Sequence, residues 1–165
     1  MNEGSDLLSR AVLGAAGGFA GTLVIQALLG ASRRFAPGTL PPLREEPGRF
    51  MVKKAEQALP ELVRGRIPEA AERAAAGGLA LGYGLAFGVL YALVRPQGGN
   101  PLVEGLALGT ACWAVGYLGW LPALGLLPPV WEQRAPQALA PVAEHLVYGM
   151  TTVAAYDWLR RRVEG

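Results

Sequence analysis

His145 is the only histidine of the sequence, and its neighbours are suited to proton transfer. Glu144 precedes it, and Tyr148 and Thr152 follow at spacings that put them on the same face of a helix. An ionisable residue inside an apolar helix is a candidate functional residue, because its burial costs free energy. We predict a polar path for protons or a small solute, formed by Glu104, Glu144, His145, Tyr148 and Thr152. The alternative is that Glu144 and His145 anchor the helix one turn inside the membrane interface, bonded to a neighbouring helix or to headgroups.

Other catalytic chemistry lacks suitable residues in this sequence. Zinc sites need three or four ligands and a bis-histidine haem needs two, whereas the chain has one histidine and one cysteine, Cys112. The serines, Ser5, Ser9 and Ser32, flank the first apolar stretch, and none stands in a Gly-x-Ser-x-Gly turn. We therefore expect no enzymatic activity, no cofactor and no metal.

A Pro-Pro-x-x-Glu motif occurs twice, each time just after an apolar stretch. Gly38 to Glu46 and Gly125 to Gln133 share Gly, Leu, Pro, Pro, an aliphatic residue and Glu at identical spacing. A second pattern, Tyr-Gly followed by Tyr and Arg, begins at both Tyr83 and Tyr148. The two patterns predict tandem helical hairpins in a parallel repeat. Both proline motifs then lie at the same membrane face, as a candidate interface motif of Pro41, Pro42, Glu45, Pro128, Pro129 and Glu132.

The composition indicates a small integral membrane protein. The chain has 165 residues, of which 52% are apolar and only 17% are charged, and its mean hydropathy is +0.27. An ordinary soluble domain carries about 25% charged residues. The apolar content excludes intrinsic disorder, and a single cysteine excludes an internal disulfide. The net charge of +2 is too small and scattered to indicate a nucleic-acid partner.

Four apolar stretches predict four membrane-spanning helices within a single membrane domain, 1–165. Pro68 followed by Glu69 and Glu72 is typical of a helix start, so the second helix is expected to begin outside the membrane. The first loop carries an amphipathic pattern that predicts a surface helix. The predicted fold is an all-α four-helix membrane bundle with spans at about 10–32, 72–95, 103–127 and 140–160 and an amphipathic insert at about 47–67.

Small residues repeat at helical spacing in the first three spans. In a bilayer such faces let helix backbones approach closely, within one chain or between two copies. The predicted packing residues are Gly14, Gly18, Gly21, Gly78, Gly82, Gly105, Gly109 and Gly116. The expected partners are the lipid bilayer and either a second copy of the chain or another membrane protein.

The carboxy-terminal third resembles the YagU-like inner-membrane proteins, a bacterial family of unknown function. The resemblance rests on Gly125 to Glu132, on Glu144 to Tyr148 and on Asp157 to Arg162, with a further match at Leu40 to Pro42. It implies a multi-pass protein of the bacterial inner membrane with a cytoplasmic carboxyl terminus, and for some relatives a link to acid tolerance. The basic residues, ten on the face of the large loop against five on the face of the termini, instead favour a cytoplasmic loop. The orientation therefore stays open.

Two functional hypotheses follow from the sequence. The first is a non-enzymatic structural or stress-related membrane protein that acts by associating with lipid or with a partner. The second is a small oligomeric transporter or channel that uses the polar face of Glu144, His145 and Tyr148. Transport requires a water-accessible path to this face, whereas association does not.

Overall fold

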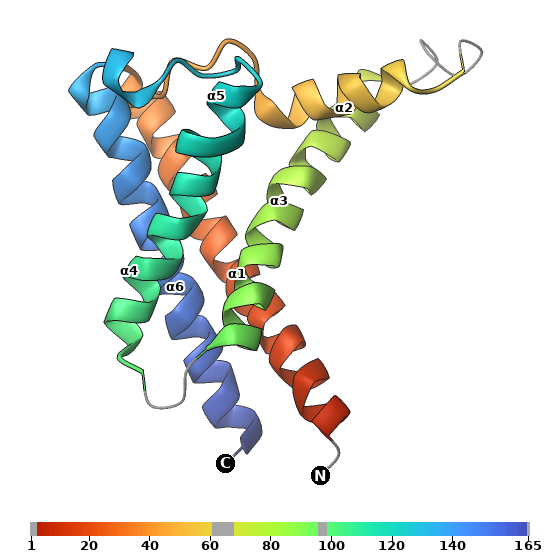
Figure 1. The fold of residues 1–165 in the computed structure, drawn as a ribbon, viewed down its shortest axis with the longest axis vertical. Helices are drawn as coiled ribbons and strands as arrows, with labels where there is room; N and C mark the ends of the chain where they lie inside the picture. The colour runs from red at the N-terminus through yellow and green to blue at the C-terminus, as the bar shows by residue number, and fades with distance from the viewer. Residues whose placement is uncertain (1–2, 61–67, 96–98, 165) are drawn as a thin grey trace.

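The computed structural model describes residues 3–60, 68–95 and 99–164, and all the regular structure within these ranges is helical (Figure 1). The expected all-α class is therefore confirmed. The first turns of α1 and α4 and the last turns of α3 and α6 lie at one end of the molecule, which we call the terminal end, whereas α2 and α5 lie at the opposite end, the α2 end. The elements, in chain order, are α1 (Glu3–Phe35), η1 (Pro37–Thr39), α2 (Pro47–Gln57), α3 (Glu69–Val94), α4 (Pro101–Trp113), η2 (Ala114–Trp120), α5 (Leu121–Ala123), η3 (Val130–Glu132) and α6 (Ala135–Glu164).

The helix ends follow local sequence signals. Pro68 caps α3, and Glu69 and Glu72 lie in its first turn, where negative charge stabilises the helix dipole. Asn100 caps α4 by accepting hydrogen bonds from the backbone N–H groups of Leu102 and Val103 at 2.9 and 3.4 Å. Pro68 and Asn100 both have extended backbone angles, so each helix begins directly after its capping residue.

The helices α1 and α3 cross through glycine contacts. A Cβ atom added at Gly14 would lie 2.5 Å from the carbonyl oxygen of Gly88, and one at Gly18 would lie 2.5 Å from that of Gly84. Backbones can approach this closely only where neither helix carries a side chain. Toward the α2 end the two helices diverge, and α3 leans away from the rest of the molecule (Figure 1).

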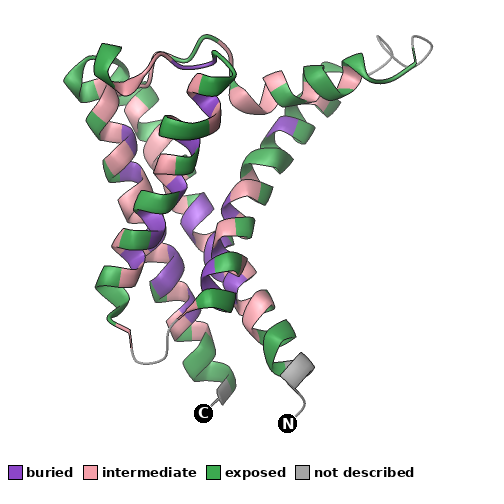
Figure 2. Ribbon diagram, in the orientation of Figure 1, coloured by how far each residue is buried: buried purple, intermediate pink, exposed green. Residues whose placement is uncertain are grey.

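A similar glycine contact joins α4 to α6, and α6 also packs along α1. A Cβ at Gly105 would lie 2.8 Å from the Cα of Met150, while Gly109 and Gly149 meet backbone atoms of the facing helix. The buried core lies where the four long helices meet, and outer faces are exposed (Figure 2). Its members are Tyr91, Ala92, Leu108, Cys112, Tyr148, Val153 and Tyr156.

Three of the predicted packing glycines have other surroundings. No atom from another helix lies within 4 Å of a Cβ built at Gly78 or Gly82, so neither glycine is at a close helix contact within the described chain. Gly116 is buried, and a Cβ built at this position would lie 3.6 Å from the hydroxyl of Tyr83. Gly84 and Gly88, rather than Gly78 and Gly82, form the α3 side of the helix contact. Close packing of Gly78 and Gly82 therefore stays a prediction only for contact between two copies of the chain.

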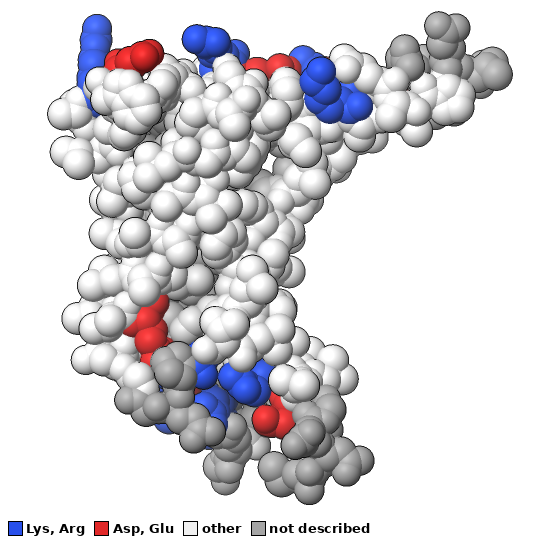
Figure 3. Space-filling model, in the orientation of Figure 1, with Lys and Arg blue, Asp and Glu red and all other residues white. Residues whose placement is uncertain are grey.

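Three helical segments in the described ranges are long and apolar enough to cross a membrane: Asp6–Phe35, Glu69–Val94 and Pro101–Ala123. Only 28%, 22% and 28% of their apolar windows are buried, so most of this apolar surface faces outward. Charged side chains gather at the two ends, with a broad uncharged belt between them (Figure 3). The arrangement is compatible with a membrane protein. Polar residues, Glu144 and His145 among them, lower the hydropathy of α6, which does not qualify by the same measure.

Candidate functional site: a cavity between the helices

A cavity of about 670 Å³ lies where α3 diverges from the other helices. Its walls come from α1, α3, η2 and α6, and residues between Leu40 and Met51 line it at the α2 end. Ligand-binding cavities in proteins commonly measure about 300–1,000 Å³. The lining is mostly apolar, and its aromatic members are Tyr83, Tyr117, Trp120, His145 and Tyr148. The volume is therefore sufficient for a small amphipathic molecule.

A π-helical segment forms one wall of this cavity. The helix that begins at Pro101 widens into η2, and within η2 Gly119 has non-helical dihedral angles of φ −97° and ψ −106°. Gly116, Tyr117 and Trp120 of this segment all line the cavity. π-Helical turns inside α-helices are rare and occur often at functional sites, because the extra residue redirects side chains.

Toward the terminal end, the cavity lining ends at hydrogen-bonded side chains. The hydroxyl of Tyr148 donates to the carbonyl oxygen of Gly84 at 2.5 Å, and that of Thr22 donates to Gly18 at 2.8 Å. Beyond Tyr148, the buried side chains of Val153 and Tyr156 fill the space toward the terminal end. The cavity therefore extends from the α2 end only part of the way through the molecule.

Four of the five residues predicted to form a polar path lie along α6, each with its own neighbours. Ser32 donates a hydrogen bond to Glu144 at 3.0 Å, and Nδ1 of His145 lies 2.7 Å from the carbonyl oxygen of Pro141. Thr152 is buried near Tyr148, against Gly21 of α1. Of this group, His145 and Tyr148 line the cavity.

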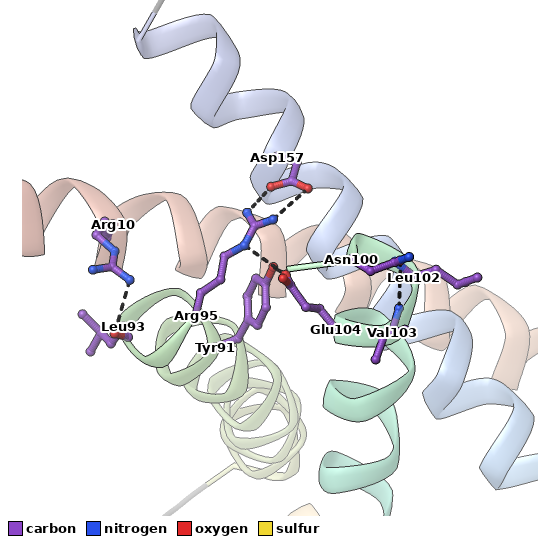
Figure 4. A network of polar contacts seen from close by, with 9 residues as sticks. All are labelled: Arg10, Tyr91, Leu93, Arg95, Asn100, Leu102, Val103, Glu104 and Asp157. Atoms are coloured by element: carbon purple, nitrogen blue, oxygen red, sulfur yellow. Dashed lines mark hydrogen bonds and ion pairs between the residues drawn. The ribbon is translucent and has the colours of Figure 1, made fainter. Parts of the chain in front are cut away.

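Glu104, the fifth predicted path residue, lies in a different cluster at the terminal end (Figure 4). Its carboxylate forms an ion pair with Nε of Arg95 at 2.9 Å and accepts a hydrogen bond from Tyr91 at 2.5 Å. Asp157 pairs with the same guanidinium. Because Asp157 is about 20 Å along α6 from Glu144, Glu104 is remote from the other four residues.

The side chains of this Arg95 cluster are largely buried. The exposed fractions are 12% for Arg95, 9% for Glu104 and 13% for Asp157. The guanidinium carbon lies 5.7 Å from the ring centre of Tyr91 and 5.4 Å from that of Tyr156. The cluster ties α3, α4 and α6 together. The sequence analysis did not predict the ion pair between Arg95 and Asp157. The sequence does place these two opposite charges at the ends of apolar stretches, and that pattern could have indicated the pair.

The two proline motifs lie together at the α2 end. The backbone N–H of Arg44 donates to the carbonyl oxygen of Leu126 at 2.9 Å, and its guanidinium donates to Gly125 at 3.3 Å. Gly125 has a φ of 70°, which favours glycine. The loops after Pro41 and Pro42 and before Pro128 and Pro129 are therefore hydrogen-bonded to each other.

The glutamates of the two motifs differ in their contacts. Glu45 accepts a hydrogen bond from Lys53 of α2 at 2.5 Å, and this bond raises the pKa of Lys53. Glu132 is exposed and lies in η3. The proline motif around Glu45 thus holds α2 next to the cavity through the bond to Lys53. The motif around Glu132 forms the turn between α5 and α6.

No group of three or more His, Cys, Asp or Glu residues that could hold a metal ion occurs in the parts of the chain that the structure describes. Comparison of this chain with protein-family models, with curated proteins and with solved structures found no match.

Proposed function

We propose that the chain is a non-enzymatic, multi-spanning membrane protein that binds a lipid-like molecule in the cavity between α1, α3, η2 and α6. The observation that carries the proposal is the cavity of about 670 Å³, whose lining is mostly apolar. An apolar molecule dissolved in the bilayer gains contacts with the aromatic and aliphatic lining without leaving an apolar environment.

The depth of the cavity fits one leaflet of a bilayer. Along α1 the lining extends from Arg33 to Thr22, which is about 16 Å at the rise of an α-helix. The hydrocarbon core of a bilayer is about 30 Å thick, so one leaflet is about 15 Å. Because the cavity lining reaches no further toward the terminal end than Thr22, Gly84 and Tyr148, its extent favours binding over transport through the molecule.

We further infer that α6 is a fourth membrane span and that α1–α3 and α4–α6 are tandem hairpins. Aligning Gly38 with Gly125 also aligns Gly18 with Gly105, and aligning the two Tyr-Gly pairs aligns Gly84 with Gly149. Gly18 contacts Gly84, and Gly149 contacts Gly105, so equivalent positions make equivalent helix contacts. The bacterial inner-membrane location and the stress-related role stay predictions from the YagU-like resemblance.

We expect Ala80→Trp to remove most of the lipid that co-purifies with the protein. Ala80 is on the α3 wall, and an indole at this position fills space that a ligand needs. The measurement is the amount of each lipid per mole of protein after detergent purification, determined by mass spectrometry of the extract.

Ala86→Trp is the matched control for this experiment. Ala86 is also an exposed alanine of α3 but does not line the cavity, so this variant should retain lipid at the wild-type level. Equal lipid content in the two variants and the wild type would contradict binding in the cavity.

A further inference from the structure

His145 presents a hydrogen-bond acceptor to the cavity. A carbonyl oxygen can only accept, so the contact of 2.7 Å with Pro141 places the imidazole proton on Nδ1. The ring packs edge-on against Tyr117 and lines the mostly apolar cavity, where a charged imidazolium is costly. In the neutral ring, Nε2 then carries a lone pair, and no described residue donates to it.

Gln26 is the second polar group of the cavity wall with free hydrogen-bonding capacity. It is an exposed residue of α1 that lines the cavity, and no hydrogen bond within the described ranges engages its amide. Gly21 of α1 lies against Tyr148 and Thr152 of α6. From that contact, Gln26 is about 7 Å and His145 about 5 to 10 Å toward the α2 end, so both are at similar depth.

The charged residues of the lining lie at its α2 end. They are Arg33 and Glu46, and Glu46 already pairs with Arg49 at 3.3 Å. Arg33 is about 10 Å along α1 from Gln26. Around Gln26 and His145, by contrast, the described lining carries no charged side chain. A group bound at that depth is therefore neutral, since an unpaired charge in such surroundings is costly.

We propose that the cavity selects a neutral amphiphile whose polar group is a hydroxyl, which donates to Nε2 of His145 and bonds to the amide of Gln26. The inference rests on the proposed function and specifies its ligand class. The hydroxyl supplies the one donor that His145 lacks, and it also accepts from the amide of Gln26. The hydrocarbon part packs against Tyr83, Tyr117 and Trp120.

The test compares farnesol with its methyl ether as ligands of the protein in lipid nanodiscs. The two probes share the same hydrocarbon, but only the alcohol can donate a hydrogen bond. Binding is measured with radiolabelled probes, and the Ala80→Trp variant gives the background of partitioning into lipid. We expect the wild type to bind farnesol about five- to tenfold more tightly than the ether.

Substitutions in the cavity wall test which residues cause the tighter binding of farnesol. His145→Leu should bind both probes equally, and Gln26→Leu should weaken farnesol about fivefold. His145→Gln, which keeps an acceptor, should retain the preference. Arg161→Ala serves as the control and should leave the farnesol affinity unchanged, because Arg161 is exposed near the end of α6 and does not line the cavity.

The outcomes separate this inference from the proposed function. Equal binding of the two probes by the wild type, or an undiminished preference in His145→Leu, overturns the hydroxyl inference alone. Tighter binding of radiolabelled phosphatidylglycerol, lost in Arg33→Ala, assigns the cavity to an anionic phospholipid and also overturns it. If neither farnesol, its ether nor phosphatidylglycerol binds above the Ala80→Trp background, the proposed function fails as well.

Discussion

Arg95→Ala is expected to lower the free energy of unfolding by about 3 to 5 kcal/mol, the usual cost of removing one partner from a buried ion pair. The substitution leaves Glu104 and Asp157 close together at exposed fractions of 9% and 13% without their shared cation. It also removes the packing of the guanidinium against Tyr91 and Tyr156. The measurement is unfolding in mixed detergent micelles with increasing dodecyl sulfate, followed by circular dichroism.

The control and the rescue for Arg95→Ala use the same assay. Arg161→Ala removes an exposed arginine near the end of α6 and should change the stability by less than about 0.5 kcal/mol. Combining Arg95→Met with Glu104→Gln and Asp157→Asn should recover most of the loss, because a neutral buried cluster carries no uncompensated charge. A loss below about 1 kcal/mol for Arg95→Ala would show that the cluster is not needed for stability.

Gly18→Ala and Gly82→Ala are expected to have opposite effects on stability. At Gly18 the added methyl group would lie 2.5 Å from the carbonyl oxygen of Gly84, so α1 and α3 must separate, at a cost of about 1 to 3 kcal/mol. At Gly82 the methyl group meets no atom within 4 Å. There the higher helix propensity of alanine should stabilise the helix by up to about 1 kcal/mol.

The same unfolding titration measures both glycine variants, and cross-linking in detergent reports their oligomeric state. A stabilising or neutral effect of Gly18→Ala would contradict the assignment of Gly18 to the helix contact. A loss at Gly82 together with a loss of cross-linked dimer would show instead that a second copy packs on this face of α3.

The sequence predicted features that depend on neighbouring residues. Uncharged stretches indicated where α1 and α3 lie, and Pro68 with its following glutamates indicated the start of α3 at Glu69. The amphipathic pattern predicted a helix within 47–67, and α2 ends at Gln57. Residues 61–67 of this prediction lie outside the described residues. Such signals are local, because caps, dipole charges and hydropathy act within a few turns of one helix.

The sequence did not predict features that depend on how helices are placed relative to one another. The cavity arises because α3 leans away, and its lining comes from residues scattered along the chain. Glu104 was grouped with His145, although it lies with Arg95, because spacing along one helix says nothing of its partners on others. Gln26 carried a usable signal, as a strongly polar residue in the middle of an apolar stretch. No residue pattern in the sequence indicated the π-helical segment η2.

The limited hydropathy of α6 has a consequence for how the protein is made. The three apolar helices can enter the bilayer individually, whereas α6 carries Glu144, which accepts a hydrogen bond from Ser32, and Asp157, which pairs with Arg95. Those partners come from helices synthesised earlier. If α6 is the fourth span proposed above, its insertion depends on α1 and α3 already being in the membrane, so that membrane integration of α6 and its packing against these helices become a single event.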